Sequence, residues 1–452
     1  MKKTFCIFFS LIIIIYSVFG LNARAYVPAF EIKSKAVYLV NTDTDSVVYA
    51  KNENEKLYPA SLTKIMTAII VLERCPDKLD EEVTASKTAL DELYGTGSSI
   101  SGIIPGEILT VRQLLYCMLI PSGNDASVVL ADYVSKGNSA EFIQMMNDKA
   151  LELGLTNTHF TNSHGLHDPD HYTTAKDVYV MSKYAMNLPL FPEIVCETRY
   201  SIPKTNKKEK TTLVNKNLLM DSVFGRADGY YVSELNYQVK GIKTGTTDEA
   251  GYCLSSLATI NGYTYMCVAM GAPSVDANNK TVKINGSFTD TRDLYKWVFP
   301  NFYKETVVSA KEPLCDIAVN LSWEVDKLQL NPDRDFTALL PKDAQNPKQD
   351  IKIEFKIPKS IDAPIKKGQV IGKADLMLAG EVIGEVDLIA SESVEKSQVL
   401  SFLDRLNAIV SSPWFIIVAA FLVLSIIAYV VYAIIHNKKR NNFKKVKTYR
   451  KF

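Results

Sequence analysis

Apolar positions along the chain follow two spacings, and the change between them predicts the order of structural elements. Residues 35–52 contain two runs rich in strand-forming residues, separated by Asn41-Thr-Asp-Thr-Asp45, which predicts a β-hairpin. Residues 250–272 contain two further strand-like runs that meet at Asn261-Gly262, a pair typical of tight hairpin turns. Strands therefore begin and end a first domain whose middle has helical spacing. This order predicts an α+β fold, in which one antiparallel sheet packs with helices.

The middle of this domain contains several segments with apolar residues three and four positions apart. We expect helices from Ser61 onward, at 109–120 with Thr110 and Gln113 as a capping box, at about 125–134, and from Ser139 as N-cap to Gly154. Residues 171–186 and the segment from Asp290 are also expected to be helical, and VKGIKTG is expected to be a strand. Residues 204–238 are polar and irregular in pattern.

From about residue 306 the spacing returns to period two, in short runs separated by Pro, Gly and Asp. This predicts a small all-β domain at 304–393, which contains no cluster of catalytic residue types and is expected to act as a spacer or docking domain. The first domain is then 26–303, and residues 394–412 are expected to form a linker.

The N-terminus has the pattern of a secretory signal peptide. Lys2 and Lys3 precede an uncharged apolar run, and Ala23-Arg24-Ala25 fits a small-x-small cleavage site. We expect residues 1–25 to be removed. An uncleaved signal anchor is the alternative, and the Ala-x-Ala sequence favours cleavage.

The C-terminus has the pattern of a membrane anchor. Residues 413–436 carry no charge until the basic tail, 437–452, begins, and no acidic residue follows Asp404. A segment of this length spans the hydrocarbon core, and basic residues favour the cytoplasmic side. A buried core helix would explain neither the length nor the one-sided basic flank. We therefore expect a single-pass protein of the cell membrane with its catalytic domain outside the cytoplasm.

Composition adds limits to the possible functions. The chain is 47% hydrophobic with a formal net charge of +1, a balance that gives no support for nucleic-acid binding. Beyond Cys6 there are six cysteines, and no pair has the C-x-x-C spacing of a zinc site. An extracellular location permits disulfides, but the apolar surroundings favour six buried free thiols.

One serine–lysine pair raises a chemical question. Ser61 and Lys64 lie three residues apart at the start of an apolar helix, so both side chains point from one face. Serine is common at helix starts, and a Ser-x-x-Lys match arises by chance in a chain of this length. The pair gains meaning from two later stretches, Ser122-Gly123-Asn124 and Lys243-Thr244-Gly245, each of which alone would be a plain turn or a strand end.

In order and spacing these three stretches resemble the signatures of the penicillin-binding protein and serine β-lactamase superfamily. The wider stretches YPASLTKIMTA, MLIPSGNDAS, HGLHDPDHYTTAKD and GIKTGTTDEAGYCL resemble the low-molecular-mass D-alanyl-D-alanine carboxypeptidases. The resemblance covers about residues 36–299 and extends more weakly into the β domain. Gly123 stands where the second signature of class A β-lactamases has Asp. Many members end in an amphipathic helix that lies on the membrane, whereas this chain is expected to cross it, and its segment 204–238 looks longer than usual.

The resemblance implies a serine peptidase without cofactor or metal. Ser61 would be the nucleophile, Lys64 its base and Ser122 a proton relay to the leaving amine. The substrate-binding residues would be Asn124 and the strand residues Lys243, Thr244, Gly245 and Thr246. Lys243 would be the second cation that lowers the pKa of Lys64, Gly245 would let a bound peptide approach closely, and backbone N–H groups of Ser61 and Thr246 would form the oxyanion hole. The partners would be peptidoglycan stem peptides ending in D-Ala-D-Ala, β-lactam inhibitors that mimic them, and the cell membrane.

Other functions remain open on these residues. A β-lactamase of class A is described as holding a deacylating water with glutamate, and no Glu-x-x-x-Asn stands near Thr158. A DD-endopeptidase would share every site residue, and an inactive wall-binding protein would not need them. His159, His164, His167 and His171 fall in one loop, but their spacing matches no metal-ligand pattern.

Overall fold

The computed structural model describes residues 28–220, 230, 238–276, 280–342, 351–378 and 381–448. The predicted signal peptide lies outside the described residues, as do the last four residues of the basic tail. The chain divides into two compact units, Met1–Glu305 with Ala338–Pro347 and Thr306–Thr337 with Lys348–Phe452.

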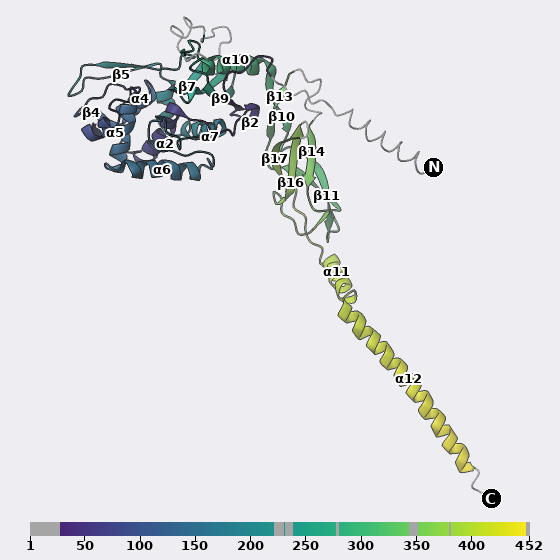
Figure 1. Cartoon of the computed structure of the whole chain (residues 1–452). Coiled ribbons are helices and arrows are strands. Elements are labelled where there is room, and N and C mark those ends of the chain that lie inside the picture. Colours follow the sequence, from purple (N-terminus) through teal and green to yellow (C-terminus); the bar gives the residue numbers. More distant parts are fainter. Residues whose placement is uncertain are drawn as a thin grey trace, which may run out of the picture. The chain divides into compact units, whose positions relative to one another are not determined.

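A five-stranded antiparallel sheet forms the centre of the first unit (Figure 1). Its order is β2 (Ser46–Lys51), β1 (Ala36–Asn41), β9 (Tyr263–Ala272), β8 (Gly251–Ile260) and β7 (Gln238–Thr247). Both predicted hairpins are confirmed. At the second, Asn261 and Gly262 have positive φ angles of 49° and 76°, which a two-residue turn between twisted strands requires.

Alternation along β1 sends successive side chains to opposite faces of the sheet. Tyr38 and Val40 join the core formed with the long helices, whereas Val37 and Leu39 pack with residues of α10 (Gly286–Asn301). The predicted α+β arrangement of one antiparallel sheet with helices is thus confirmed. The closing helix, α10, begins at Gly286 and not at Asp290, because Asn285 caps it through its side-chain oxygen.

One helix of the first unit, α2, is buried on every side over most of its length. In α2 (Lys64–Arg74) every residue from Lys64 to Leu72 is buried. Around it lie α4 (Val111–Leu119), α5 (Asn124–Ser135), α6 (Ser139–Glu152) and α7 (Ala175–Ala185) (Figure 1). The Thr110–Gln113 capping box of α4 is present as predicted, whereas the N-cap of α6 is Asn138 and not Ser139.

Shorter elements complete this unit. They are η1 (Ala60–Thr63), α3 (Lys87–Asp91), α8 (Phe191–Cys196), and the strand pairs β3 (Glu82–Thr84) with β4 (Ile108–Thr110) and β5 (Arg199–Ile202) with β6 (Thr211–Val214). Strand β6 falls in the segment expected to be irregular, so its described part is more ordered than the polar composition suggested.

The second unit is built on a six-stranded sheet, as its period-two pattern predicted. The order is β14 (Lys352–Lys356), β16 (Val370–Leu378), β17 (Glu381–Ala390), β12 (Lys327–Pro332), β11 (Cys315–Asn320) and β15 (Ser360–Asp362). Leu328, Leu330, Leu376 and Leu388 are fully buried in its core. Strands β10 (Phe302–Val308) and β13 (Phe336–Pro341) form a two-stranded sheet, and each contains a point where the chain passes between units.

Two helices end the described chain. Helix α11 (Gln398–Val410) lies in the segment expected to be a linker, and its exposed apolar residues fall three and four positions apart: Val399, Phe402, Leu403, Leu406, Ile409 and Val410. Helix α12 (Pro413–Thr448) contains a 26-residue stretch, Pro413–Lys438, within which an 18-residue window has a mean hydropathy of 2.8 and no buried share. This stretch has the length and composition needed to cross a membrane.

The cysteines of the described residues are all free thiols. Cys75, Cys117, Cys253 and Cys267 are buried as expected, whereas Cys196 and Cys315 are only half-buried. The expectation of six buried thiols was therefore wrong for two of them.

Candidate active site

Ser61 and Lys64 meet at a change of helix type. Ser61 lies on the 3₁₀ turn η1, and Lys64 is the first residue of α2. A 3₁₀ turn has three residues per turn, so side chains three positions apart stand directly above one another. The Lys64 Nζ lies 2.8 Å from the Ser61 Oγ as a result. The sequence predicted one face of a continuous α-helix, whereas in the structure a 3₁₀ turn carries Ser61 and the α-helix begins at Lys64.

Lys64 is fully buried, and its amine has three polar neighbours. Besides the Ser61 Oγ, the Nζ donates to the Asn124 Oδ1 at 2.6 Å and to the carbonyl of His164 at 2.7 Å. Burial lowers the pKa of Lys64 well below its usual value, and the positive charges of Lys243 and Lys216 lower it further. A neutral amine has two N–H donors and one lone pair. With Asn124 and His164 as acceptors, the lone pair is left for the Ser61 hydroxyl.

Ser122 and Asn124 lie where α4 turns into α5. Ser122 is buried and has a left-handed backbone with φ of 64°, which is uncommon for a residue other than glycine. Asn124 is the first residue of α5 and contacts Lys64 through its side chain. The second signature is therefore brought to the Ser61–Lys64 pair by a tertiary hydrogen bond between α5 and α2.

The third signature lies on β7, the edge strand of the sheet, beside η1. A Cβ atom on Gly245 would lie 2.9 Å from the carbonyl oxygen of Pro59 and 3.2 Å from the backbone nitrogen of Ser61. In this structure the glycine lets η1 approach β7 closely, and its predicted close approach by a bound peptide stays a prediction. Lys243 is buried with its Nζ donating to the Thr244 carbonyl at 2.9 Å, and Thr246 is exposed at the strand end.

Lys216 was missed by the sequence analysis. It donates to the Ser99 Oγ at 2.5 Å, and its charge lowers the pKa of both Lys64 and Lys243. Burial is the larger cause for Lys243, whose pKa falls well below the usual lysine value. A lowered pKa works against the positive charge expected of Lys243 as the second cation. No motif surrounds Lys216, so only the folded arrangement identifies it.

The histidine segment supports the site structurally. His171 accepts from the backbone N–H of Thr161 at its Nδ1, so its Nε2 carries the proton and donates to the Thr63 Oγ1 at 2.7 Å. Burial lowers the pKa of His171 to about 3, which keeps the ring neutral. Thr63 in turn donates to the carbonyl of Ala60, the residue before Ser61. Among the described residues no three His, Cys, Asp or Glu side chains are grouped to hold a metal ion.

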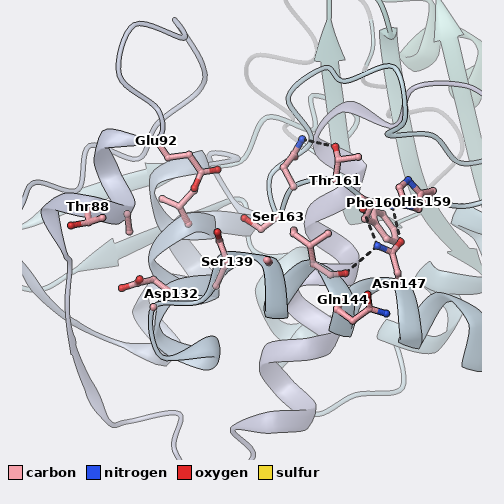
Figure 2. A pocket seen from close by; sticks show the side chains of 17 residues that line it. Thr88, Glu92, Asp132, Ser139, Gln144, Asn147, His159, Phe160, Thr161 and Ser163 are labelled. Atoms are coloured by element: carbon pink, nitrogen blue, oxygen red, sulfur yellow. Dashed lines mark hydrogen bonds between the residues drawn. The ribbon is translucent and has the colours of Figure 1, made fainter.

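A separate cavity of about 610 Å³ lies among α3, α5, α6 and residues 159–163 (Figure 2). At its wall Asn147 exchanges two hydrogen bonds of 2.9 Å with the backbone of Phe160. Glu92, also in the lining, accepts from the Nε2 of His164 at 3.1 Å. The described lining contains none of the predicted site residues, so this cavity is distinct from the Ser61–Lys64 site.

Two protein-family profiles match this chain, one in each of its two parts. The sequence profile of the D-alanyl-D-alanine carboxypeptidase family matches residues 22–274, and that of the penicillin-binding protein 5 C-terminal domain matches residues 302–396. The chain is 33% identical over 380 residues to the D-alanyl-D-alanine carboxypeptidase DacF of Bacillus subtilis (strain 168), covering 82% of this chain and 89% of the relative. It is 34% identical to DacC of Escherichia coli (strain K12), covering 83% and 87%.

The fold comparison agrees with the sequence comparison. The crystal structure of penicillin-binding protein 5 from Haemophilus influenzae superposes with a TM-score of 0.64 at 28% identity, covering 82% of this chain and all of the other. A catalytic-domain match over more than half of the chain, together with relatives that match both units, establishes the classification. The chain belongs to the D-alanyl-D-alanine carboxypeptidase family of serine peptidases.

Proposed function

We propose that this protein is a serine-type D-Ala-D-Ala carboxypeptidase that removes the terminal D-alanine from peptidoglycan stem peptides. The observation that carries the proposal is the buried Lys64 amine, whose pKa is lowered and which lies 2.8 Å from the Ser61 hydroxyl. A serine hydroxyl is a weak nucleophile until a base within hydrogen-bond reach takes its proton. Lys64 meets this requirement without a histidine.

In the proposed reaction the Ser61 Oγ attacks the carbonyl carbon of the penultimate D-alanine as its proton passes to Lys64. The C–N bond then breaks, and Ser122 passes a proton to the departing amine of the terminal D-alanine. The remaining peptide is held as an ester on Ser61 until water attacks the same carbon and restores the hydroxyl. The backbone N–H groups of Ser61 and Thr246 are the proposed donors to the oxyanion of both steps. A β-lactam would acylate Ser61 as the substrate does in the first step and would remain bound there as an ester.

Substrate binding is assigned to the edge of β7 and to Asn124. Lys243, Thr244 and Thr246 provide donors for the terminal carboxylate of the substrate, and Asn124 positions the substrate amide and Lys64. An arriving carboxylate favours the charged form of a nearby lysine. The substrate carboxylate is therefore proposed to stabilise the charged form of Lys243 against the burial that lowers its pKa.

The proposal is tested with a synthetic pentapeptide that ends in D-Ala-D-Ala. Release of one D-alanine per peptide is the expected result, and a matched peptide that ends in L-Ala-L-Ala should release none. A cross-linked dimer of stem peptides tests the DD-endopeptidase alternative, and a penicillin tests turnover as a β-lactamase. Cleavage of the cross-link alone would replace the proposed activity by the endopeptidase. Binding of wall fragments without any product would favour an inactive wall-binding protein.

We further propose that residues 1–25 are a signal peptide and that α12 crosses the cell membrane with its basic end in the cytoplasm. The apolar stretch Pro413–Lys438 supports the span, and the basic residues that follow it support the orientation. The catalytic domain would then act outside the cytoplasm, where peptidoglycan lies.

Protease accessibility tests this topology. A protease added to intact spheroplasts is expected to digest the β domain and to spare a tag placed after Phe452, since the membrane would shield the tail. Permeabilised spheroplasts provide the control, in which the tag is also digested. Loss of the tag from intact spheroplasts would reverse the proposed orientation.

A further inference from the structure

The backbone at Ser122 needs support from its surroundings. A left-handed conformation is strained for a residue with a side chain and persists only where neighbouring structure enforces it. Ser122 is also buried, so its hydroxyl cannot find its orientation freely in solvent. The contacts that enforce this turn therefore decide where the proposed proton relay points.

Ser99, in the loop that precedes β4 and α4, forms hydrogen bonds with the chain on both sides of Ser122. The Ser99 Oγ donates to the carbonyl of Pro121 at 3.2 Å, and the Ser99 carbonyl accepts from the backbone N–H of Asn124 at 2.8 Å. One loop residue thus contacts the residue before Ser122 and the second residue after it. A shift of Ser99 would be transmitted to the Ser122 backbone.

The buried carboxylate of Asp125 holds residues 101–103 of this loop. The Asp125 Oδ1 accepts from the backbone N–H and the Oγ of Ser101, both at 2.9 Å. The Oδ2 accepts from the N–H groups of Gly102 at 2.7 Å and Ile103 at 2.8 Å. Only 2% of Asp125 is exposed, so these four loop donors are shielded from competing water.

The Asp125 carboxylate also lies close to the backbone of the turn at Gly123. A Cβ atom at Gly123, the residue after Ser122, would lie 2.5 Å from the Asp125 Oδ1 and 2.9 Å from the Ser101 Oγ. Asn124 and Asp125 thus act in two directions from the first turn of α5. The side chain of Asn124 reaches Lys64, while that of Asp125 reaches the loop.

We infer that Asp125 is a positioning residue for the reaction: by holding residues 101–103 it fixes Ser99, and through Ser99 it fixes the strained backbone of Ser122. The inference assigns Asp125 no contact with the substrate. The inference rests on the proposed function, because it assumes that Ser122 acts in acylation.

The test measures the second-order rate of acylation by a fluorescent penicillin in the full-length protein. Asp125→Asn keeps the shape but has one acceptor oxygen, and its NH₂ group would face loop N–H donors. We expect acylation to fall about 30-fold, within the roughly 100-fold that a 1 Å misplacement can cost. In a Ser122→Ala background the same substitution is expected to change the rate less than about threefold, since the group that it positions is gone.

Two further variants keep this test independent of stability. Ser101→Ala removes one of the four loop donors, so we expect a loss of about threefold in the wild-type background and none in Ser122→Ala. Asp290→Asn is the matched control, because Asp290 is an equally buried carboxylate that accepts from the N–H and Oγ of Ser34, both at 2.6 Å. It is expected to leave the rate within about twofold.

The outcomes separate this inference from the proposed function. Equal losses for Asp125→Asn with and without Ser122 would show that Asp125 does not act through Ser122, and an unchanged rate for Asp125→Asn would overturn the inference directly. Labelling of Ser61 would still support the proposed function in both cases. An unchanged rate for Ser122→Ala alone would overturn the inference together with the assigned role of Ser122.

Discussion

Replacement of Ser61 by alanine is expected to abolish both D-alanine release and covalent labelling by a fluorescent penicillin. The hydroxyl is the only group at this position that can form the proposed ester, and the Lys64 amine 2.8 Å away has no proton to accept without it. The expected loss in the rate constant is at least about 10⁴-fold, by comparison with other serine nucleophiles. Gel fluorescence and a D-alanine assay measure the two effects.

Ser139→Ala provides the control for this substitution. Ser139 is an exposed residue at the start of α6, where Asn138 and not Ser139 caps the helix, so full labelling is expected. Labelling that persists in Ser61→Ala would place the nucleophile elsewhere and would contradict the proposed mechanism.

Substitution of Lys64 by arginine is expected to stop acylation even though it retains a basic side chain. A guanidinium stays protonated at any pH at which the protein is folded, so it cannot accept the Ser61 proton. We expect a loss of about 10³-fold or more, in the range of lost general-base catalysis. The second-order rate of acylation by a penicillin measures it.

The pH dependence of the wild-type protein provides an independent check on Lys64. Burial, Lys243 and Lys216 lower the pKa of Lys64, so the neutral, active form appears below the usual lysine value of 10.5. Acylation should therefore rise with pH through a pKa well below 10.5. A rise only near 10.5 would show that Lys64 is not tuned in this way.

Lys243 provides the matched comparison. Lys243→Arg is expected to retain part of the acylation rate with a D-Ala-D-Ala peptide, because a guanidinium still pairs with a carboxylate. Esterification of the substrate carboxylate should slow the wild type much more than it slows Lys243→Ala. Equal sensitivity of these two proteins to esterification would show that Lys243 does not bind the carboxylate. A loss in Lys243→Arg as large as in Lys64→Arg would instead indicate that Lys243 acts mainly on the pKa of Lys64.

Local pattern predicted the elements of the fold well, because each depends on neighbours in the chain. The hairpins at Asn41–Ser46 and Asn261-Gly262 follow from turn residues between two strand-like runs, and the α4 capping box follows from two side chains three positions apart. Helix starts that depend on a single N-cap residue were predicted less accurately. Asn285 and Asn138 set two helix starts that apolar spacing alone placed later.

The candidate site was predictable where its residues form short signatures and not where they meet only in space. Ser61-x-x-Lys64, Ser122-Gly-Asn124 and Lys243-Thr-Gly245 are local and visible in the sequence. Lys216 has no surrounding motif, and the carbonyl of His164 is a backbone group that no residue pattern marks. The close approach of η1 to Gly245 likewise appears only in the folded structure.

The sequence by itself determined the order of strands and helices, the two-unit organisation, the apolar C-terminal segment and the residues from which a Ser–Lys site could be built. The tertiary structure decided how those residues work together. It buries the Lys64 amine between Asn124 and His164, brings Lys243 and Lys216 near enough to lower its pKa, and holds the strained Ser122 turn through Asp125. The physical reason is that desolvation, charge–charge interaction and buried hydrogen bonds depend on distances between groups far apart in the chain, and folding sets those distances.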